Sequence, residues 1–293
     1  MEVFVTNETS ELERVVLGIA IDRGTPRRIN PMINQHLENG TFPHESDICR
    51  EIKTFEDVLK QNGVEVVRPT NLPETEQIFT RDIGFVIDDY FFKSNMKHSV
   101  RSKELEGINH ILNDIAETKQ ISIPDEITIE GGDVVLWNEF VFIGIGDRTT
   151  ENAIKYIQNI LPHKNVIGTE IIVDQNNADH NILHLDCAFQ PIGKDEAIIY
   201  HDGFRRFPKE ILDLFPKEKR IEVSLKEKNQ MFPNIFSIAP NKVVIEKNFV
   251  RLKDELIERG YQVFEVDYIE TSKLSGLLRC STLPLKRKQH IGK

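Results

Sequence analysis

The sequence predicts an α/β fold in which about five similar units are arranged radially around a common axis. One observation is that the order strand, strand, helix, strand recurs along the 293 residues, in units of roughly 40 to 55 residues. Another is that no linker or low-complexity segment interrupts this pattern. A single unit of this kind cannot bury its apolar face alone, so we expect the units to close on one another. Residues 1–293 are therefore predicted to form one domain, although the length alone suggests about two.

The clearest unit lies between residues 133 and 173. Two apolar runs, Val134–Trp137 and Phe140–Ile145, predict a hairpin. Thr149 or Thr150 can cap a following helix, in which apolar residues recur at the 3.6-residue spacing of an amphipathic helix. The run 166–173 then returns as a strand.

Other parts of the chain repeat this order. The predicted elements are strands 183–189 and 197–200 with helix 208–215 and strand 220–225; strands 235–238 and 243–245 with helix 248–259 and strand 261–266; and strands 83–87 and 90–92 with a helix from about 99 to 115. The N-terminal unit has a strand at 14–20, a helix at 47–61 and a strand at 64–68, but its second strand is not evident. The stretch 24–43 is predicted to be a loop.

Composition and charge restrict the function. The chain has 37 Lys and Arg against 47 Asp and Glu, a formal net charge of −10, so we expect no nucleic-acid partner and a small cationic ligand instead. Three cysteines are too few for a disulfide framework and favour a reducing, cytoplasmic location. No signal-peptide pattern or membrane-spanning run is found, so no membrane association is expected. Association into a homo-oligomer is left open.

Four polar clusters occur near the start of a unit's first strand or close to the C-terminus. They are Thr80-Arg81-Asp82, Glu130-Gly131-Gly132-Asp133, His184-Leu185-Asp186 and Arg279-Cys280-Ser281-Thr282. If the units are related by rotation, equivalent strand ends converge on the axis. The paired glycines also indicate a close approach of backbone. We therefore predict one pocket that gathers these clusters.

A thiol, an imidazole and several carboxylates indicate a particular chemistry. A thiol becomes nucleophilic when a cation lowers its pKa, and a nearby His can transfer protons. Surplus carboxylates oppose thiolate formation unless the substrate itself is the cation, and a planar guanidinium pairs with carboxylates in a bidentate way. Asp82 and Asp186 could then hold a guanidinium while Cys280 attacks its central carbon.

Each cluster has an ordinary structural interpretation when taken singly. Thr80-Arg81-Asp82 could end a strand with a surface ion pair, His184-Leu185-Asp186 could be a satisfied polar pair, and Cys280 could be a buried apolar residue. A zinc site from His184, Asp186 and Asp133 is a further alternative, but no close His/Cys ligand spacing supports it. Together, the clusters favour the catalytic interpretation.

The motifs Phe79-Thr80-Arg81-Asp82, Ile129-Glu130-Gly131-Gly132-Asp133, His184-Leu185-Asp186 and Arg279-Cys280-Ser281-Thr282-Leu283-Pro284-Leu285 resemble those of the arginine deiminases. More broadly they resemble the guanidino-group-modifying superfamily, which includes amidinotransferases and dimethylarginine hydrolases. The resemblance covers nearly the whole chain. It implies the pentein α/β-propeller, with five ββαβ units around a pseudo-fivefold axis.

The resemblance also implies roles for individual residues. Cys280 corresponds to the nucleophile, His184 to the general acid/base, and Asp82 and Asp186 to the guanidinium clamp. Glu130 corresponds to the acid that completes the clamp and orients His184, with Asp133 behind it. Arg101 and Arg148 match positions that hold the α-carboxylate of the substrate in arginine deiminases. No metal or other cofactor is implied.

This chain also departs from the arginine deiminases. It is too short for their inserted helical bundle, and Glu76 stands where an Asn commonly helps to bind the amino-acid end of the substrate. Asp186 weighs against the dimethylarginine hydrolases, which usually lack this clamp residue, whereas amidinotransferases keep the His-x-Asp pair and a late Cys. We therefore predict a hydrolase of arginine or a close guanidino relative. An amidinotransferase, a dimethylarginine hydrolase, a non-catalytic guanidino-binding protein and a structural protein are the alternatives.

Overall fold

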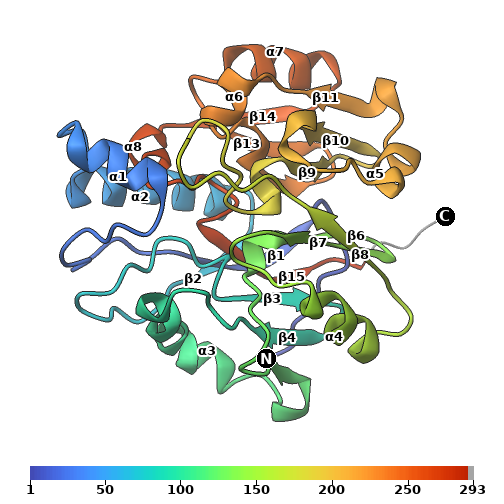
Figure 1. Ribbon diagram of the computed structural model, residues 1–293, viewed down its shortest axis with the longest axis horizontal. Coiled ribbons are helices and arrows are strands. Elements are labelled where there is room, and N and C mark those ends of the chain that lie inside the picture. The colour runs from blue at the N-terminus through green and yellow to red at the C-terminus, as the bar shows by residue number, and fades with distance from the viewer. Residues whose placement is uncertain (290–293) are drawn as a thin grey trace.

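The computed structural model describes residues 1–289, and these residues form five three-stranded sheets (Figure 1). The sheets contain β3 (Gly84–Ile87), β4 (Tyr90–Lys93) and β5 (Gln120–Ser122); β6 (Val134–Trp137), β7 (Phe140–Ile145) and β8 (Asn165–Glu170); β9 (Phe189–Ile192), β10 (Glu196–Ile199) and β11 (Arg220–Glu222); β12 (Phe236–Ala239), β13 (Lys242–Glu246) and β14 (Gln262–Val266); and β15 (Thr282–Arg287), β1 (Leu12–Leu17) and β2 (Glu65–Val67). In every sheet the middle strand is antiparallel to the first and parallel to the last. The predicted five-unit α/β-propeller is confirmed.

The fifth sheet joins the two ends of the chain. Its first strand, β15, comes from the C-terminal region and pairs with β1 from the N-terminal region, with Val16 opposite Leu283. On its other side β1 pairs in parallel with β2, with Val16 opposite Val67. The strand that the sequence did not reveal in the N-terminal unit is therefore β15, which closes the ring of units.

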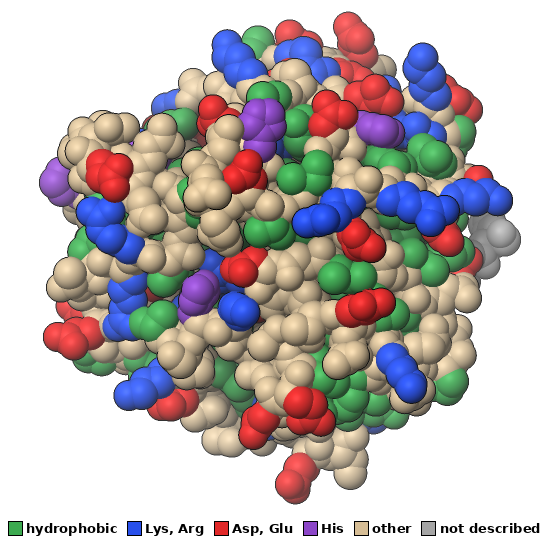
Figure 2. Space-filling view, viewed as in Figure 1, with side chains coloured by type: hydrophobic (Ala, Val, Ile, Leu, Met, Phe, Trp, Pro, Cys, Tyr) green, Lys and Arg blue, Asp and Glu red, His purple; other side chains and the backbone are tan. Residues whose placement is uncertain are grey.

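Helices connect the middle strand of each unit to its last strand and lie around the outside of the molecule (Figure 1). They are α1 (Pro31–Glu38) and α2 (Glu45–Gln61), α3 (Asn109–Leu112), α4 (Asn152–Ile160), α5 (Lys209–Leu214) and α7 (Val250–Glu258), whereas α6 (Leu225–Asn229) and α8 (Ile269–Ser272) lie between units. None of the helices among residues 1–289 is long and apolar enough to cross a membrane. Figure 2 shows basic and acidic side chains interspersed on one face of the protein.

Several predicted elements need correction. The predicted helix 99–115 is mostly the 3-10 helix η1 (Ser99–Ile108), whose buried residues Arg101, Glu104 and Gly107 follow its three-residue period. The predicted strand 183–189 contains a tight 3-10 turn, η4 (Leu185–Cys187), before β9 begins. The predicted loop 24–43 includes α1, which Asn30 caps through a hydrogen bond from the Ile33 N–H.

Apolar side chains form two buried clusters. The larger lies under β9–β14 and the face of α2, where Phe55 meets Phe236 and Tyr268 edge to face. The smaller lies under β3–β8. Burying such rings contributes roughly 1.5–3 kcal/mol each. The packed clusters fix the strand ends from which the polar residues project.

Candidate active site

A tight turn comes directly before the first strand of every unit. These are the turns at 80–83 before β3, η3 (Gly131–Asp133) before β6, η4 before β9, η7 (Phe232–Asn234) before β12, and the turn at 278–281 before β15. Four of them are the polar clusters of the sequence. Since the units surround one axis, the turns meet there, and residues up to about 200 positions apart come into contact, such as the Thr80 hydroxyl and the Ser281 carbonyl.

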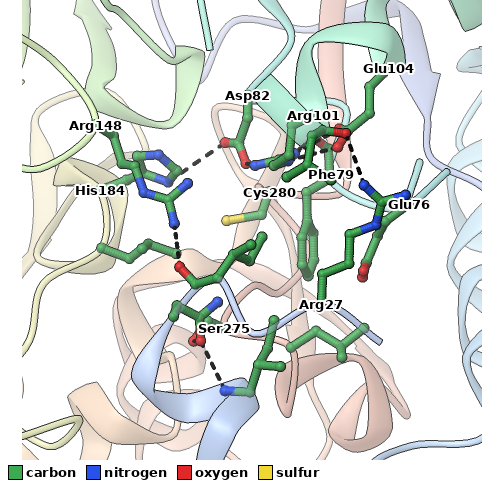
Figure 3. A pocket seen from close by; sticks show the side chains of 16 residues that line it. Arg27, Glu76, Phe79, Asp82, Arg101, Glu104, Arg148, His184, Ser275 and Cys280 are labelled. Carbon is green, nitrogen blue, oxygen red and sulfur yellow. Dashed lines mark hydrogen bonds and ion pairs between the residues drawn. The ribbon is translucent and has the colours of Figure 1, made fainter. Parts of the chain in front are cut away.

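A cavity opens at this meeting point (Figure 3). The sulfur of Cys280 lies in the middle of the labelled side chains, with His184 and Arg148 on one side and Phe79 on the other. The wall has an apolar part and a charged part, and the charged lining residues are Arg27, Glu76, Asp82, Arg101, Glu104 and Arg148. Such an enclosed, mixed surface suits a small charged ligand.

His184 lies between two carboxylates. Its Nε2 is 2.8 Å from Glu130 Oε2, and its Nδ1 is 3.6 Å from Asp82 Oδ1. Burial favours the neutral imidazole, but the surrounding carboxylates outweigh it and raise the pKa of His184 to about 9. Burial also opposes the charge of Glu130, yet the contact with His184 and nearby arginines lower its pKa to about 2. At neutral pH the pair is therefore an imidazolium and a carboxylate.

Asp82 presents a carboxylate oxygen to the cavity. Its Oδ2 accepts a hydrogen bond from Arg101 at 2.8 Å, whereas the buried Oδ1 has no hydrogen-bond partner among residues 1–289. An unpaired buried oxygen is costly unless a ligand satisfies it. Asp82 Oδ1 is therefore well placed to accept a hydrogen bond from a cationic ligand.

Cys280 is almost completely buried, and its sulfur contacts two polar side chains. Asp186 Oδ2 lies 3.5 Å from Sγ, and Asn234 Nδ2 lies 3.1 Å from it. Burial, together with the charges of Asp186 and Asp82, holds the pKa of the Cys280 thiol well above its usual value. Without a ligand the sulfur is therefore a thiol.

Asp186 lies behind the sulfur and is fully buried rather than on the cavity wall. Its Oδ2 accepts a hydrogen bond of 2.7 Å from Arg279, which also donates to Glu8 and to the Val134 carbonyl. Burial disfavours the charge of Glu8, but Arg279 and Arg81 lower the pKa of Glu8 to about 2. The carboxylate beside Cys280 is thus held by a buried ionic network.

The two arginines expected to bind a carboxylate line the cavity. Arg148 donates to Glu130 at 3.4 Å and to the Ile29 carbonyl at 3.2 Å. Arg101 makes a bidentate pair with Glu104, at 2.7 and 2.8 Å, besides its bond to Asp82. Arg101 therefore already has carboxylate partners, and Arg148 is the less engaged of the two.

The Glu130-Gly131-Gly132-Asp133 motif packs against His184, as the paired glycines indicated. A Cβ on Gly132 would lie 2.6 Å from His184 Nδ1 and 2.9 Å from Asp82 Oδ1. Asp133 is buried behind the imidazole, where it accepts hydrogen bonds from Thr149 and from the Leu185 N–H. Burial raises the pKa of Asp133 to about 7.

Two segments outside the polar clusters contribute to the wall of the pocket. The stretch 24–43 supplies Arg27, Ile29, Asn30 and Ile33, and the segment before Cys280 supplies Leu274 and Ser275. At the same end Glu76 pairs with Arg23 at 3.2 Å.

The carboxylates and imidazole also define a possible metal site. Among the described residues, Asp82, Glu130 and His184 place one ligand atom each within 4.8 Å of one another. This set differs from the one considered from sequence, since Asp133 and Asp186 are engaged elsewhere. Arg101 and Arg148 both contact Glu130, so positive charge already surrounds these carboxylates.

The other two cysteines lie outside the cavity wall. In the predicted strand 183–189, Cys187 and Asp186 would face opposite sides. Because η4 curls the backbone there, the Cys187 sulfur lies 3.6 Å from Asp186 Oδ1 instead. Cys49, on α2, contacts the Ala20 carbonyl.

Sequence reasoning missed three residues of the site. Glu104 follows Arg101 by three positions, a spacing that brings them together on a 3-10 helix. Asn234 occupies the turn before β12, the unit in which no polar cluster was recognised. Glu8 gives no local signal, because its partner Arg279 is 271 positions away.

Comparison with known proteins agrees with this fold. The family described as "N,N dimethylarginine dimethylhydrolase, eukaryotic" matches residues 27–287, and the chain belongs to this family. The predicted membership of the guanidino-group-modifying superfamily is thereby confirmed. The matching family is that of the dimethylarginine hydrolases. The presence of Asp186 had been an argument against this branch.

Individual relatives extend the comparison. YkgA of Bacillus subtilis (strain 168) is 32% identical over 260 residues, covering 85% of this chain and 86% of that protein. The N-terminal domain of ArgZ, a cyanobacterial arginine dihydrolase, superposes with a TM-score of 0.81 at 20% identity, covering 94% of this chain and 98% of that one. SxtG, an amidinotransferase from Microseira wollei, gives a TM-score of 0.77 at 16% identity over 99% of both chains. At these identities the two structures show the fold alone.

Proposed function

We propose that this chain is a cysteine-dependent hydrolase of a guanidino compound, arginine or a close relative. It would release ammonia or an amine and a ureido product, which is citrulline when the substrate is arginine. The observation that carries this proposal is that Cys280, His184 and Asp82 share one cavity, where Asp82 Oδ1 has no hydrogen-bond partner among residues 1–289 and lies 3.6 Å from His184 Nδ1. These groups supply a nucleophile, a proton donor and an anchor for a cation.

Binding begins with the guanidinium. Asp82 Oδ1 accepts from one edge of the cation, and Asp186, behind the sulfur, attracts it from the other side. The cation lies against Cys280, whose thiolate is disfavoured by burial and by the nearby carboxylates. Substrate charge offsets this environment, so the thiol releases its proton to solvent when a substrate is bound, and the sulfur takes up a proton again when the protonated ureido product is released and loses it.

The first half of the reaction forms a covalent intermediate. The Cys280 thiolate attacks the guanidinium carbon, and a C–S bond forms. His184, already an imidazolium through its contact with Glu130, protonates the nitrogen that leaves. Cleavage of the C–N bond leaves a thiouronium on Cys280, and general acid catalysis of this kind contributes roughly 10²- to 10⁴-fold.

The second half consumes water. His184, now neutral, takes a proton from a water molecule, which attacks the thiouronium carbon. The C–S bond breaks, the ureido product leaves, and His184 regains its proton. Glu130 keeps Nε2 of the ring engaged, which leaves Nδ1 toward Asp82 and the cavity.

The far end of the cavity would recognise the rest of the substrate. Arg148 is the better candidate for an α-carboxylate, because Glu104 already binds Arg101 in a bidentate pair. Glu76 lies on the opposite side of Cys280 from Arg148 (Figure 3), and its carboxylate favours an ammonium group. Together these charges suit an α-amino acid with a guanidino side chain.

A methylated arginine is the second candidate substrate. The family match favours it, since that family is described by its action on N,N-dimethylarginine. The apolar lining, which includes Phe79, Leu183 and Leu274, would tolerate methyl groups on the guanidinium. In this case an alkylamine leaves in place of ammonia.

Amidino transfer is the remaining enzymatic alternative. The same thiouronium would form, but an acceptor amine would attack it instead of water. The cavity geometry leaves the second nucleophile open, so product analysis must separate the two reactions.

A screen tests the proposal directly. The protein is incubated with arginine, methylated arginines, agmatine and guanidino acids, with and without an acceptor amine, while ammonia, alkylamine and ureido product are measured together. A ureido product without acceptor supports hydrolysis, and product only with acceptor identifies a transferase. Absence of any product from all of these compounds would contradict the proposal.

Mass spectrometry separates an enzyme from a protein that only binds guanidino compounds. Acid quenching during turnover should trap an adduct on Cys280, and Cys280→Ser should abolish both adduct and turnover. A folded wild-type protein that binds a guanidino ligand but never forms an adduct would be a binding protein instead.

A further inference from the structure

Asn234 occupies the place in its unit where the other units carry their reactive residues. It ends η7, in the turn before β12, as Asp186 lies in the turn before β9 and Cys280 in the turn before β15. Its side chain is fully buried. Because four of the five equivalent turns carry polar side chains of the site, we ask whether Asn234 in the fifth turn also takes part in the reaction.

The Asn234 side chain holds Cys280 at two points. Its Oδ1 accepts a hydrogen bond from the Cys280 backbone N–H at 3.1 Å, and its Nδ2 donates to Cys280 Sγ at 3.1 Å. A backbone N–H requires an acceptor, so the amide can present only its donor end to the sulfur. The Asn234 carbonyl also accepts the Arg279 N–H at 3.3 Å, which ties the whole turn to η7.

The other surroundings of the sulfur favour the thiol. Burial, Asp186 and Asp82 all oppose the anion, and Asp186 Oδ2 can only accept a hydrogen bond. Among residues 1–289, Asn234 supplies the side-chain donor bonded to Sγ. A hydrogen bond to an anion is stronger than one to a neutral group, so this donor favours the thiolate over the thiol.

The backbone that delivers Asn234 is itself constrained. Met231, just before η7, has φ 68° and ψ 30°, a left-handed conformation that is uncommon for a residue with a side chain. The Met231 carbonyl accepts the Asn234 N–H at 2.9 Å. Local strain of this kind persists where the surrounding structure requires a particular geometry.

We propose that Asn234 is a catalytic residue, whose amide N–H stabilises the thiolate of Cys280 and aims its sulfur into the cavity. This inference rests on the proposed nucleophilic role of Cys280. It assigns the turn before β12 to the reaction and makes Asn234 a partner of the sulfur rather than of the substrate.

Site-resolved alkylation tests the inference without a substrate. The full chain is treated with iodoacetamide across a pH series, and labelling of Cys280 is followed on the tryptic peptide 280–286, which separates it from Cys49 and Cys187. Asn234→Asp keeps the acceptor for the backbone N–H but loses the donor, and Asn234→Ala loses both. The matched control is Asn181→Asp, since Asn181 uses only its Oδ1, toward the Asp174 N–H, and does not line the Cys280 cavity.

Loss of the donor should raise the midpoint of the alkylation profile by about one to two pH units in both variants, more in Asn234→Asp because of its charge. The control should leave the midpoint unchanged, and all variants should reach a similar rate at high pH. An unshifted midpoint in Asn234→Ala, or a lower plateau without a shift, would overturn the inference in favour of a structural role. Because alkylation needs no guanidino substrate, a shifted midpoint with no turnover in the screen would count against the proposed function alone.

Discussion

Replacing Arg279 with methionine should destabilise the protein more than most single substitutions. Arg279 is fully buried and donates to Asp186 at 2.7 Å, to Glu8 at 2.9 Å and to the Val134 carbonyl at 2.7 Å. Methionine fills a similar volume but leaves two buried carboxylates and a carbonyl without their donor. Removing one partner of such a network costs about 3–5 kcal/mol.

The pKa of Glu8 gives an independent magnitude. Its lowering from 4.5 to about 2 corresponds to roughly 3 kcal/mol of stability at neutral pH. A carboxyl whose folded pKa is depressed contributes this stability above its unfolded pKa of about 4.5 and loses it as the pH falls toward 2. The difference between wild type and Arg279→Met should therefore be greatest near pH 7 and narrow below about pH 5, where Glu8 can protonate in the variant.

Urea unfolding at 25 °C, followed by circular dichroism at a series of pH values, measures this difference. Thermal melting should show a loss of roughly 10 °C. Arg251→Met is the matched control, because Arg251 pairs with Glu227 and Glu255 on the surface, with its side chain 45% exposed, and should cost under about 1 kcal/mol. A loss below about 1 kcal/mol for Arg279→Met, or a difference that stays constant into acid, would refute the reasoning.

Three further outcomes are expected. Gly132→Ala should lower turnover by about tenfold or more, because its Cβ would lie 2.6 Å from His184 Nδ1; a native melting curve with unchanged kcat would contradict this. The rate of adduct formation in rapid-quench experiments should fall as the pH rises through about 9, where His184 loses its proton; a flat profile would exclude His184 as the donor. Arg148→Ala should raise KM for arginine at least about tenfold more than for agmatine, which lacks the carboxylate; equal losses would argue against an α-amino acid substrate.

The repeat was predictable because each unit carries its own local pattern of strands and helix. The strand that completes the first unit was not, since periodicity identifies a strand but not its partner. β15 pairs with β1 across nearly the whole length of the chain, as in the pair Leu17 and Thr282. The 3-10 helix η1 was predicted as an α-helix for another reason. Its charged residues Arg101 and Glu104 are buried at a three-residue spacing. The pattern of an amphipathic α-helix instead places charged residues on the solvent-facing side.

The candidate site was predictable where several reactive residue types stood together. Asp82, His184 and Cys280 lie in the recognised clusters, and the structure brings them to one cavity. Asn234 was missed because a single amide carries no chemical signal of its own. The rotational repeat could have found it, since η7 occupies the equivalent turn before β12.

The charges around Cys280 explain why substrate and Asn234 would both be needed. A cation about 4 Å from the sulfur, at an effective dielectric constant of about 20, stabilises the thiolate by about 4 kcal/mol, or roughly three pH units. A single amide donor contributes about one to two pH units. Burial and Asp186 hold the pKa of the Cys280 thiol well above its usual value, so both contributions act against the surroundings of the sulfur. Substrate charge is the larger of the two, so under the proposed function the thiolate would form chiefly when a cation occupies the cavity.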